Sequence, residues 1–87
     1  MLQVVLVKAD WCNGCHKVLE KIETSSINLP HLKIADFEDN LELCKQSGVK
    51  SIPTVLFLSH SGSVLDRIDS DITPEKIEEK YNQLNSK

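Results

Sequence analysis

The sequence predicts an α/β fold in which three helices flank a four-stranded mixed sheet, in the order βαβαββα. Two observations lead to this prediction. Short aliphatic runs, typical of strands buried on both faces, alternate with segments whose apolar residues recur at helical spacing. A strand, a helix and a second strand also fit within about 35 residues, which is the pattern of a right-handed βαβ unit with parallel strands. We expect a single domain over residues 1–87.

The first half of the chain contains the predicted βαβ unit. The first strand is expected around Val4–Val7, where four aliphatic residues stand in succession. A helix should start at or beside Cys12, because apolar residues then fall at positions 15, 18, 19 and 22, on one helical face. The segment SSINLP, residues 25–30, should break that helix. Leu32–Phe37 has the length and partial alternation of the second strand.

The middle of the chain carries a shorter helical signal. Asp39 and Glu42 have the spacing of a capping box, which predicts a helix from there through about Gln46. Gly48 should end it.

The last part of the chain predicts a hairpin and a final helix. Pro53–Ser59 is the strong strand, and Val64–Asp69 is a weaker strand that pairs with it through the turn HSGS. Thr73 is the expected N-cap of the last helix and Pro74 its first residue. Apolar residues at 77, 81 and 84 share one face of this helix, which should run to about Asn85.

Composition and charge argue against several classes of function. The chain has 10 Lys and Arg against 13 Asp and Glu, a net charge of -3, and no basic cluster, so we expect no nucleic-acid partner. The N-terminal apolar run is only Val4–Val7, which predicts neither a signal peptide nor a membrane span. Three cysteines are too few for a disulfide-stapled scaffold. We therefore expect the protein in the reducing cytoplasm.

The stretch WCNGC, residues 11–15, carries the candidate chemistry. Cys12 should lie where a strand ends and a helix begins, so unpaired N–H groups and the positive end of the helix dipole favour its thiolate. Cys15 follows one turn later on the core-facing side, and this spacing lets the two sulfurs approach bonding distance. Because the closed loop is very short, the disulfide would add little stability. A redox role therefore fits better than a structural one.

A metal site is the main alternative for this cysteine pair. A closed zinc site needs four ligands, and only Cys44 and three scattered histidines remain to complete it. We expect no metal and no organic cofactor. Cys44 lies three residues after Leu41 on the presumed inner face of its helix, so it should be a buried, inert thiol. His16 should face solvent, and Asp10, at the end of the first strand, is a candidate weak proton acceptor for the dithiol.

The motifs WCNGC and SIPT (residues 51–54), together with the βαβαββα order, resemble the thioredoxin family over about residues 2–84. The resemblance implies a thioredoxin-like fold and an enzyme, a thiol–disulfide oxidoreductase that reduces protein disulfides. In this reading Cys12 is the nucleophile and Cys15 is the resolving cysteine. The implied partners are disulfide-containing proteins and a reductase such as thioredoxin reductase, and we expect a monomer.

The resemblance also implies which residues bind substrate. Ile52 and Pro53 should be joined by a cis peptide bond, and their backbone should accept the substrate strand. Trp11, directly before the nucleophile, should shield the site or contact the substrate. From the residues alone, Pro53 at the start of a strand is equally compatible with a trans bond.

The chain departs from the family pattern close to the cysteines. Asn13 and Gly14 replace the usual Gly-Pro between them, so these two residues should tune the site by loosening the first helical turn. The buried aspartate of many relatives and its lysine partner align with Leu6 and Ile34, which removes an obvious general base for Cys15. Two alternatives stay open: a glutaredoxin-like, glutathione-dependent reductase, and a non-catalytic binding module with the same fold.

Overall fold

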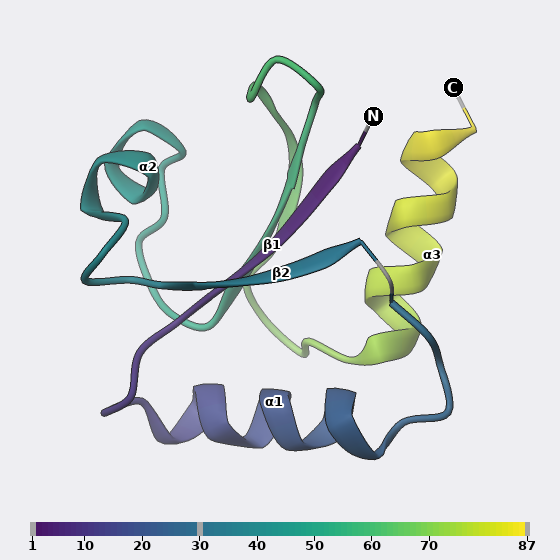
Figure 1. Ribbon diagram of the computed structural model, residues 1–87, viewed down its shortest axis with the longest axis horizontal. Coiled ribbons are helices and arrows are strands. Elements are labelled where there is room, and N and C mark those ends of the chain that lie inside the picture. Colours follow the sequence, from purple (N-terminus) through teal and green to yellow (C-terminus); the bar gives the residue numbers. More distant parts are fainter. Residues whose placement is uncertain (1, 30, 87) are drawn as a thin grey trace.

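A computed structural model describes residues 2–29 and 31–86, so Met1, Pro30 and Lys87, which the expected domain includes, lie outside the described residues. The chain follows the predicted βαβαββα order (Figure 1). Its elements are β1 (Gln3–Lys8), α1 (Asn13–Thr24), β2 (Leu32–Asp36), α2 (Leu41–Gln46), β3 (Thr54–Leu58), β4 (Val64–Ile68) and α3 (Pro74–Asn85). Within the described ranges, no helix has both the length and the apolar character needed to cross a membrane.

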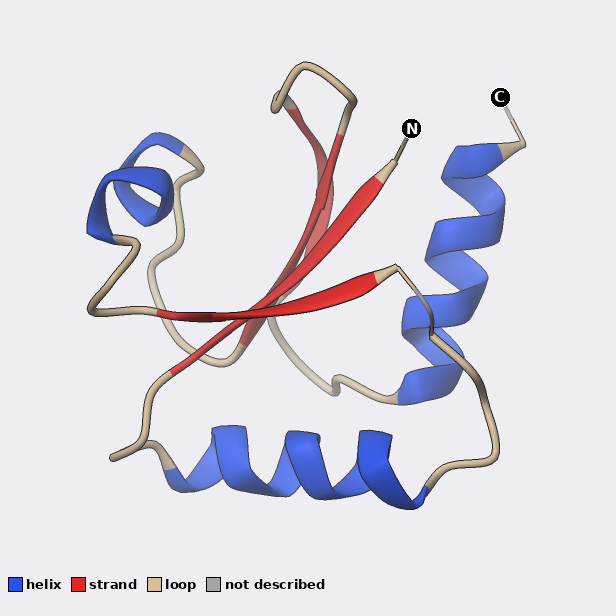
Figure 2. Cartoon of the chain, in the orientation of Figure 1, coloured by secondary structure: helices blue, strands red, loops and turns tan. Residues whose placement is uncertain are grey.

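The four strands form one mixed sheet in the order β2-β1-β3-β4, which confirms the predicted fold class (Figure 2). β1 pairs with β2 in parallel and with β3 antiparallel, and β3 and β4 form the predicted hairpin. Every residue of β3 is buried, as are the four central residues of β1. These two strands occupy the middle of the sheet, which explains why their sequences are continuous aliphatic runs.

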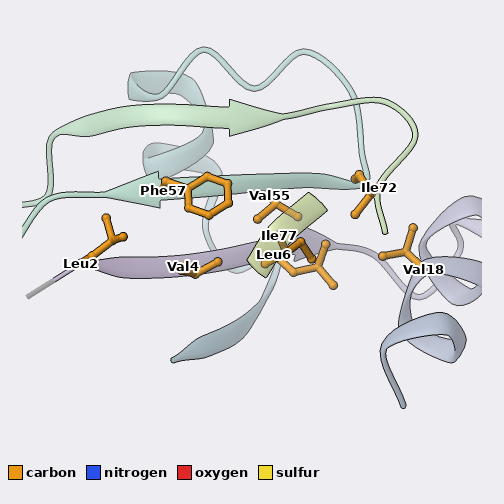
Figure 3. Close-up of a cluster of buried hydrophobic side chains, with 8 residues drawn as sticks. All are labelled: Leu2, Val4, Leu6, Val18, Val55, Phe57, Ile72 and Ile77. Carbon is orange, nitrogen blue, oxygen red and sulfur yellow. The ribbon is translucent and has the colours of Figure 1, made fainter. Parts of the chain in front are cut away.

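Side chains alternate along β1 and β3, and this alternation divides the core into two clusters, one on each face of the sheet. On one face, Leu6 and Phe57 pack with Val18 of α1 and Ile77 of α3 (Figure 3). On the other face, Cys44 of α2 packs against the alternate residues of the two strands, Val5, Val7, Leu56 and Leu58. Helices α1 and α3 therefore cover one face, and α2 covers the other.

The two long helices begin where the sequence predicts. Cys12 is the N-cap of α1. Thr73 is the N-cap of α3, and its Oγ1 accepts the N–H of Lys76 at 3.2 Å, while Pro74 occupies the first helical position. In both helices a side chain at the N-cap accepts a backbone N–H of the first turn, so each start is marked by a short-range signal.

The predicted capping box of the middle helix, at Asp39 and Glu42, is wrong. α2 begins at Leu41, and its N-cap Asn40 makes no capping hydrogen bond through its side chain. The Asn40 amide donates instead to the carbonyl of the last β2 residue at 2.8 Å, which extends the preceding turn. Glu42 accepts a hydrogen bond from Gln46 at 3.1 Å rather than reaching back to the helix start.

The inner face of α2 also differs from the prediction. Leu41 is 56% exposed, whereas Cys44 is buried as expected. Because the helix has only 6 residues, its first residue lies beyond the part that packs on the sheet. Gly48 follows the helix with a φ of +70°, a left-handed conformation that glycine adopts without strain, so its predicted role as the stop is confirmed.

Candidate active site

Cys12 lies between the carboxyl end of β1 and the first turn of α1. Its Sγ accepts the backbone N–H of Cys15 at 3.1 Å, one of the donors that a first helical turn leaves unpaired. Its own N–H donates to the carbonyl of Ala9 at 3.1 Å, which holds the connecting turn. An N–H aimed at a sulfur, together with the helix dipole, stabilises negative charge on that sulfur. The predicted placement of Cys12 at a helix terminus is confirmed.

Cys15 is fully buried, one turn further into α1. Burial, and then the hydrogen bond and negative charge of Cys12, raise the pKa of Cys15 to about 11. A backbone hydrogen bond from Ala9 acts in the opposite direction and lowers the pKa. Cys12 is partly exposed, so the two thiols differ in their access to solvent.

The loop before β3 lies against the cysteine motif. The Ile52–Pro53 peptide bond is cis, as the family resemblance implies. The Sγ of Cys12 lies 3.8 Å from the carbonyl oxygen of Ile52, to which the thiol donates. A Cβ placed on Gly14 would lie 3.5 Å from the Pro53 ring, so the first turn of α1 and the loop are in close contact. Ile52 and Pro53, the two loop residues predicted to bind substrate, thus lie against the Cys12–Cys15 motif.

Trp11 stands at the surface beside Cys12 and is 65% exposed, so it is not a core aromatic. Its indole N–H donates to the carboxylate of Glu38 at 3.0 Å, which orients the ring. The indole forms one wall of a groove of about 340 Å³, completed by Phe37, Val49, Lys50, Ser51 and Ile52. The predicted contact between Trp11 and substrate stays a prediction.

The other residues singled out in the sequence lie near the cysteine pair, except for Cys44. Asn13 and Gly14 are exposed in the first turn of α1. His16 faces solvent as predicted, and one of its ring nitrogens lies 2.8 Å from the carbonyl oxygen of Asp10. Cys44 lies in the cluster on the other face of the sheet, and burial raises its pKa. Within residues 2–29 and 31–86, no group of three or more His, Cys, Asp or Glu could hold a metal ion.

Sequence reasoning missed a charged cluster at the end of β1. The Nζ of Lys8 lies 2.9 Å from a carboxylate oxygen of Asp10 and 3.4 Å from one of Asp36. The hydrogen bond and the positive charge of Lys8 lower the pKa of Asp10, which makes this carboxylate a poorer proton acceptor than an isolated aspartate. The parallel register, which places Lys8 opposite Asp36, is the signal that could have revealed the cluster.

A cis-proline loop facing a Cys-x-x-Cys pair at a helix N-terminus, on this sheet, defines the thiol–disulfide oxidoreductases as a class. The sequence matches the family model for thioredoxin over residues 1–83, and the chain belongs to the thioredoxin family. A search of curated protein sequences gives no match.

Solved structures of thioredoxins have the same fold. Thioredoxin 1 from Thermosipho africanus is 24% identical, with a TM-score of 0.69, and the match covers 98% of this chain and 99% of that one. Thioredoxin from Fasciola hepatica is 26% identical with a TM-score of 0.70, over 94% of this chain and 79% of that one. Malaria parasite thioredoxin-2, described as a component of the protein secretion machinery, is 21% identical with a TM-score of 0.77, over 95% and 82%.

The raised pKa of Cys15 predicts that the reduced protein loses stability in alkali. The folded state keeps the proton on this sulfur up to about pH 11, whereas an unfolded thiol releases it near its ordinary value of 9.0. Between these values the unfolded state binds fewer protons, so the free energy of unfolding falls as the pH rises. We expect a loss of about 2 kcal/mol across this window, measured by urea denaturation of the reduced protein.

The oxidised protein is the matched control for this measurement. Its Cys15 carries no proton, so its free energy of unfolding should fall less steeply over the same pH range. Cys44, whose pKa burial also raises, contributes equally to both forms. Parallel pH profiles for the reduced and oxidised proteins would show that Cys15 has an ordinary pKa.

Proposed function

We propose that the protein reduces disulfide bonds in protein substrates through a reversible dithiol–disulfide pair formed by Cys12 and Cys15. One observation carries most weight: a partly exposed sulfur at a helix N-terminus, with a buried thiol one turn behind it and 3.1 Å between the Cys15 nitrogen and the Cys12 sulfur. Such a pair provides one thiol that substrate can reach and a second thiol that substrate cannot reach. This division of roles suits a two-step exchange.

In the first step the Cys12 thiolate attacks one sulfur of a substrate disulfide. The bond between Cys12 and that sulfur forms, the substrate disulfide breaks, and the departing sulfur leaves as a thiolate that takes a proton from water. The groove beside Trp11 and Ile52 is open to a substrate strand at this point. The product is a mixed disulfide between enzyme and substrate.

In the second step Cys15 attacks the Cys12 sulfur. The Cys12 sulfur carries no charge once it is in the mixed disulfide. The two effects of Cys12 that raise the pKa of Cys15, its hydrogen bond and its negative charge, are then removed. The buried thiol therefore ionises more easily at the stage that needs it. The Cys12–Cys15 bond forms, and the second substrate sulfur leaves as a thiolate. The dithiol supplies both electrons, and a separate reductase must restore it.

The direct test is insulin reduction with dithiothreitol as electron donor, followed by precipitation of the insulin B chain. We expect the protein to accelerate precipitation well beyond the rate with dithiothreitol alone. A rate equal to that background would rule out protein-disulfide reduction and favour the binding-module alternative.

The regenerating partner is tested by replacing dithiothreitol with two enzymatic systems. We propose a reductase of the thioredoxin reductase type, supported by the exposed indole beside Cys12, which a protein partner can contact. Turnover with thioredoxin reductase and NADPH is the expected result. Turnover only with glutathione and glutathione reductase would assign the protein to the glutathione-dependent alternative.

We propose that the protein works as a monomer in the cytoplasm. The odd, small number of cysteines supports a reducing compartment. Light scattering on the reduced protein should give the chain mass of 9.8 kDa, and a doubled mass would exclude the monomer. Fractionation of cells with an antibody to the protein tests the compartment.

A further inference from the structure

Two apolar residues occupy the place on the sheet where a general base for Cys15 would be expected. Leu6 of β1 lies opposite Ile34 of β2, and neither side chain can take or stabilise a charge. Because side chains alternate along a strand, the next pair on the same face is Lys8 and Asp36. This is the face that α1 covers, with Cys15 on the side of α1 turned toward the sheet.

Lys8 is held in place at this position. Its ammonium bridges the carboxylates of Asp10 and Asp36 at 2.9 and 3.4 Å, and its side chain is only 21% exposed. The hydrogen bond that Lys8 donates to Asp10 raises the pKa of Lys8 the most, so the ammonium stays charged at neutral pH. A cation on a flexible side chain is thereby fixed at the end of β1.

The same strand end reaches the Cys15 sulfur. The residue after Lys8, Ala9, donates its backbone N–H to that sulfur. The charge of Lys8 acts in the same direction as this hydrogen bond, and both lower the pKa of Cys15 against the larger effect of burial. The strand end therefore supplies two groups that favour a thiolate at Cys15.

We propose that Lys8, clamped by Asp10 and Asp36, is a positioning residue that stabilises the Cys15 thiolate during the resolving step. The proposal rests on the proposed function. Lys8 keeps its protons throughout: the proton of Cys15 passes to water, the Cys15 sulfur bonds to the Cys12 sulfur, and the substrate sulfur leaves with the electron pair of the broken bond. A fixed cation thus favours the thiolate form of Cys15, in place of a buried carboxylate base that would take its proton.

The other titratable groups around Cys15 do not replace Lys8. Cys12 loses its charge in the mixed disulfide. The ring of His16, on the exposed side of α1, bonds to the backbone of Asp10. The carboxylates of Asp10 and Asp36 are engaged with the ammonium, and negative charges near a thiol oppose its ionisation. Lys8, on the face of the sheet that α1 covers, is the cation whose charge lowers the pKa of Cys15.

The test measures the ionisation of Cys15 without any substrate. In a Cys12→Ser background, the ¹³Cβ chemical shift of Cys15 is followed against pH by NMR, which resolves Cys44 separately and needs no reagent to reach the buried sulfur. Adding Lys8→Gln should move the midpoint to higher pH by about half a unit to one unit. Lys8→Arg should restore it, because guanidinium keeps the charge. Lys17 is an exposed lysine of α1, the helix that carries Cys15, and provides the matched control. Lys17→Gln should leave the midpoint unchanged.

A second measurement uses the intact pair and Ellman's reagent, an aromatic disulfide. Attack by Cys12 releases the first thionitrobenzoate, and attack by Cys15 on the mixed disulfide releases the second. Lys8→Gln should slow the second release about three- to tenfold at neutral pH, and slow it more than the first. Circular dichroism and urea denaturation confirm that the variants are folded.

Two results would overturn the proposal: an unchanged midpoint in Lys8→Gln, or the same shift in Lys8→Arg as in Lys8→Gln. Because the titration of Cys15 needs no substrate, its failure is distinct from failure of the proposed function. Insulin reduction by the wild type with no shift in Lys8→Gln would reject only the role of Lys8. A shift in a protein that does not reduce insulin would reject only the proposed function.

Discussion

Cys12→Ser is expected to abolish disulfide reduction, and Cys15→Ser to stop the reaction at a stable mixed disulfide with the substrate. Removing the nucleophile leaves no group that can attack the substrate, so the rate of insulin reduction should fall by about three orders of magnitude or more. Removing the resolving thiol leaves the first step intact, because the Cys12 sulfur keeps the N–H of residue 15 as a hydrogen-bond donor. Non-reducing gels and mass spectrometry detect the trapped complex.

Cys44→Ala is the matched control for the two cysteine variants. This thiol is buried under α2, in the cluster on the other face of the sheet from Cys15. We expect the variant to reduce insulin at nearly the wild-type rate. Reduction by Cys12→Ser, or a trapped complex that involves Cys44, would contradict the assigned roles.

Phe57→Ala should produce the largest loss of stability among single core substitutions. Phe57 is fully buried in the central strand β3 and packs with residues from β1, α1 and α3. Truncating a buried phenylalanine costs about 3 to 5 kcal/mol, whereas a whole domain is stable by about 5 to 15 kcal/mol, with small domains at the lower end. Urea denaturation of the reduced protein should therefore show a variant close to its unfolding threshold.

Leu65→Ala is the control for the core substitution. Leu65 lies on the neighbouring strand β4 but is 49% exposed, so its truncation should cost about 1 kcal/mol or less. Equal losses in the two variants would mean that the cluster shared by α1, α3 and the sheet does not provide most of the stability.

Local signals in the sequence account for most of the fold. β1 and β3 are predictable because a strand buried on both faces reads as a continuous aliphatic run. The start of α3 is predictable because Thr73 and Pro74 act within one helical turn. The positions of Cys12 and Cys15 follow in the same way, from a strand that ends and a helix that begins.

Contacts between distant residues account for what the sequence does not predict. At the start of α2, the side-chain amide of Asn40 donates to the backbone carbonyl of Asp36 instead of capping the helix. Neither helix propensity nor apolar periodicity predicts this bond. The bond from Trp11 to Glu38 spans 27 residues, and that from Lys8 to Asp36 spans 28. Both require the register of β1 against β2. The chemistry of the cysteine pair can therefore be predicted from the motif, whereas the groups around the pair can be identified only in the folded sheet.

The most direct measurement is a redox titration of the three thiols. The protein is equilibrated in glutathione buffers of graded potential, the free thiols are alkylated in acid, and each cysteine is scored by peptide mass spectrometry. Cys12 and Cys15 should lose their thiols together along one two-electron curve while Cys44 stays reduced. Oxidation of Cys12 alone to a glutathione adduct, or pairing of either cysteine with Cys44, would contradict the reversible Cys12–Cys15 bond.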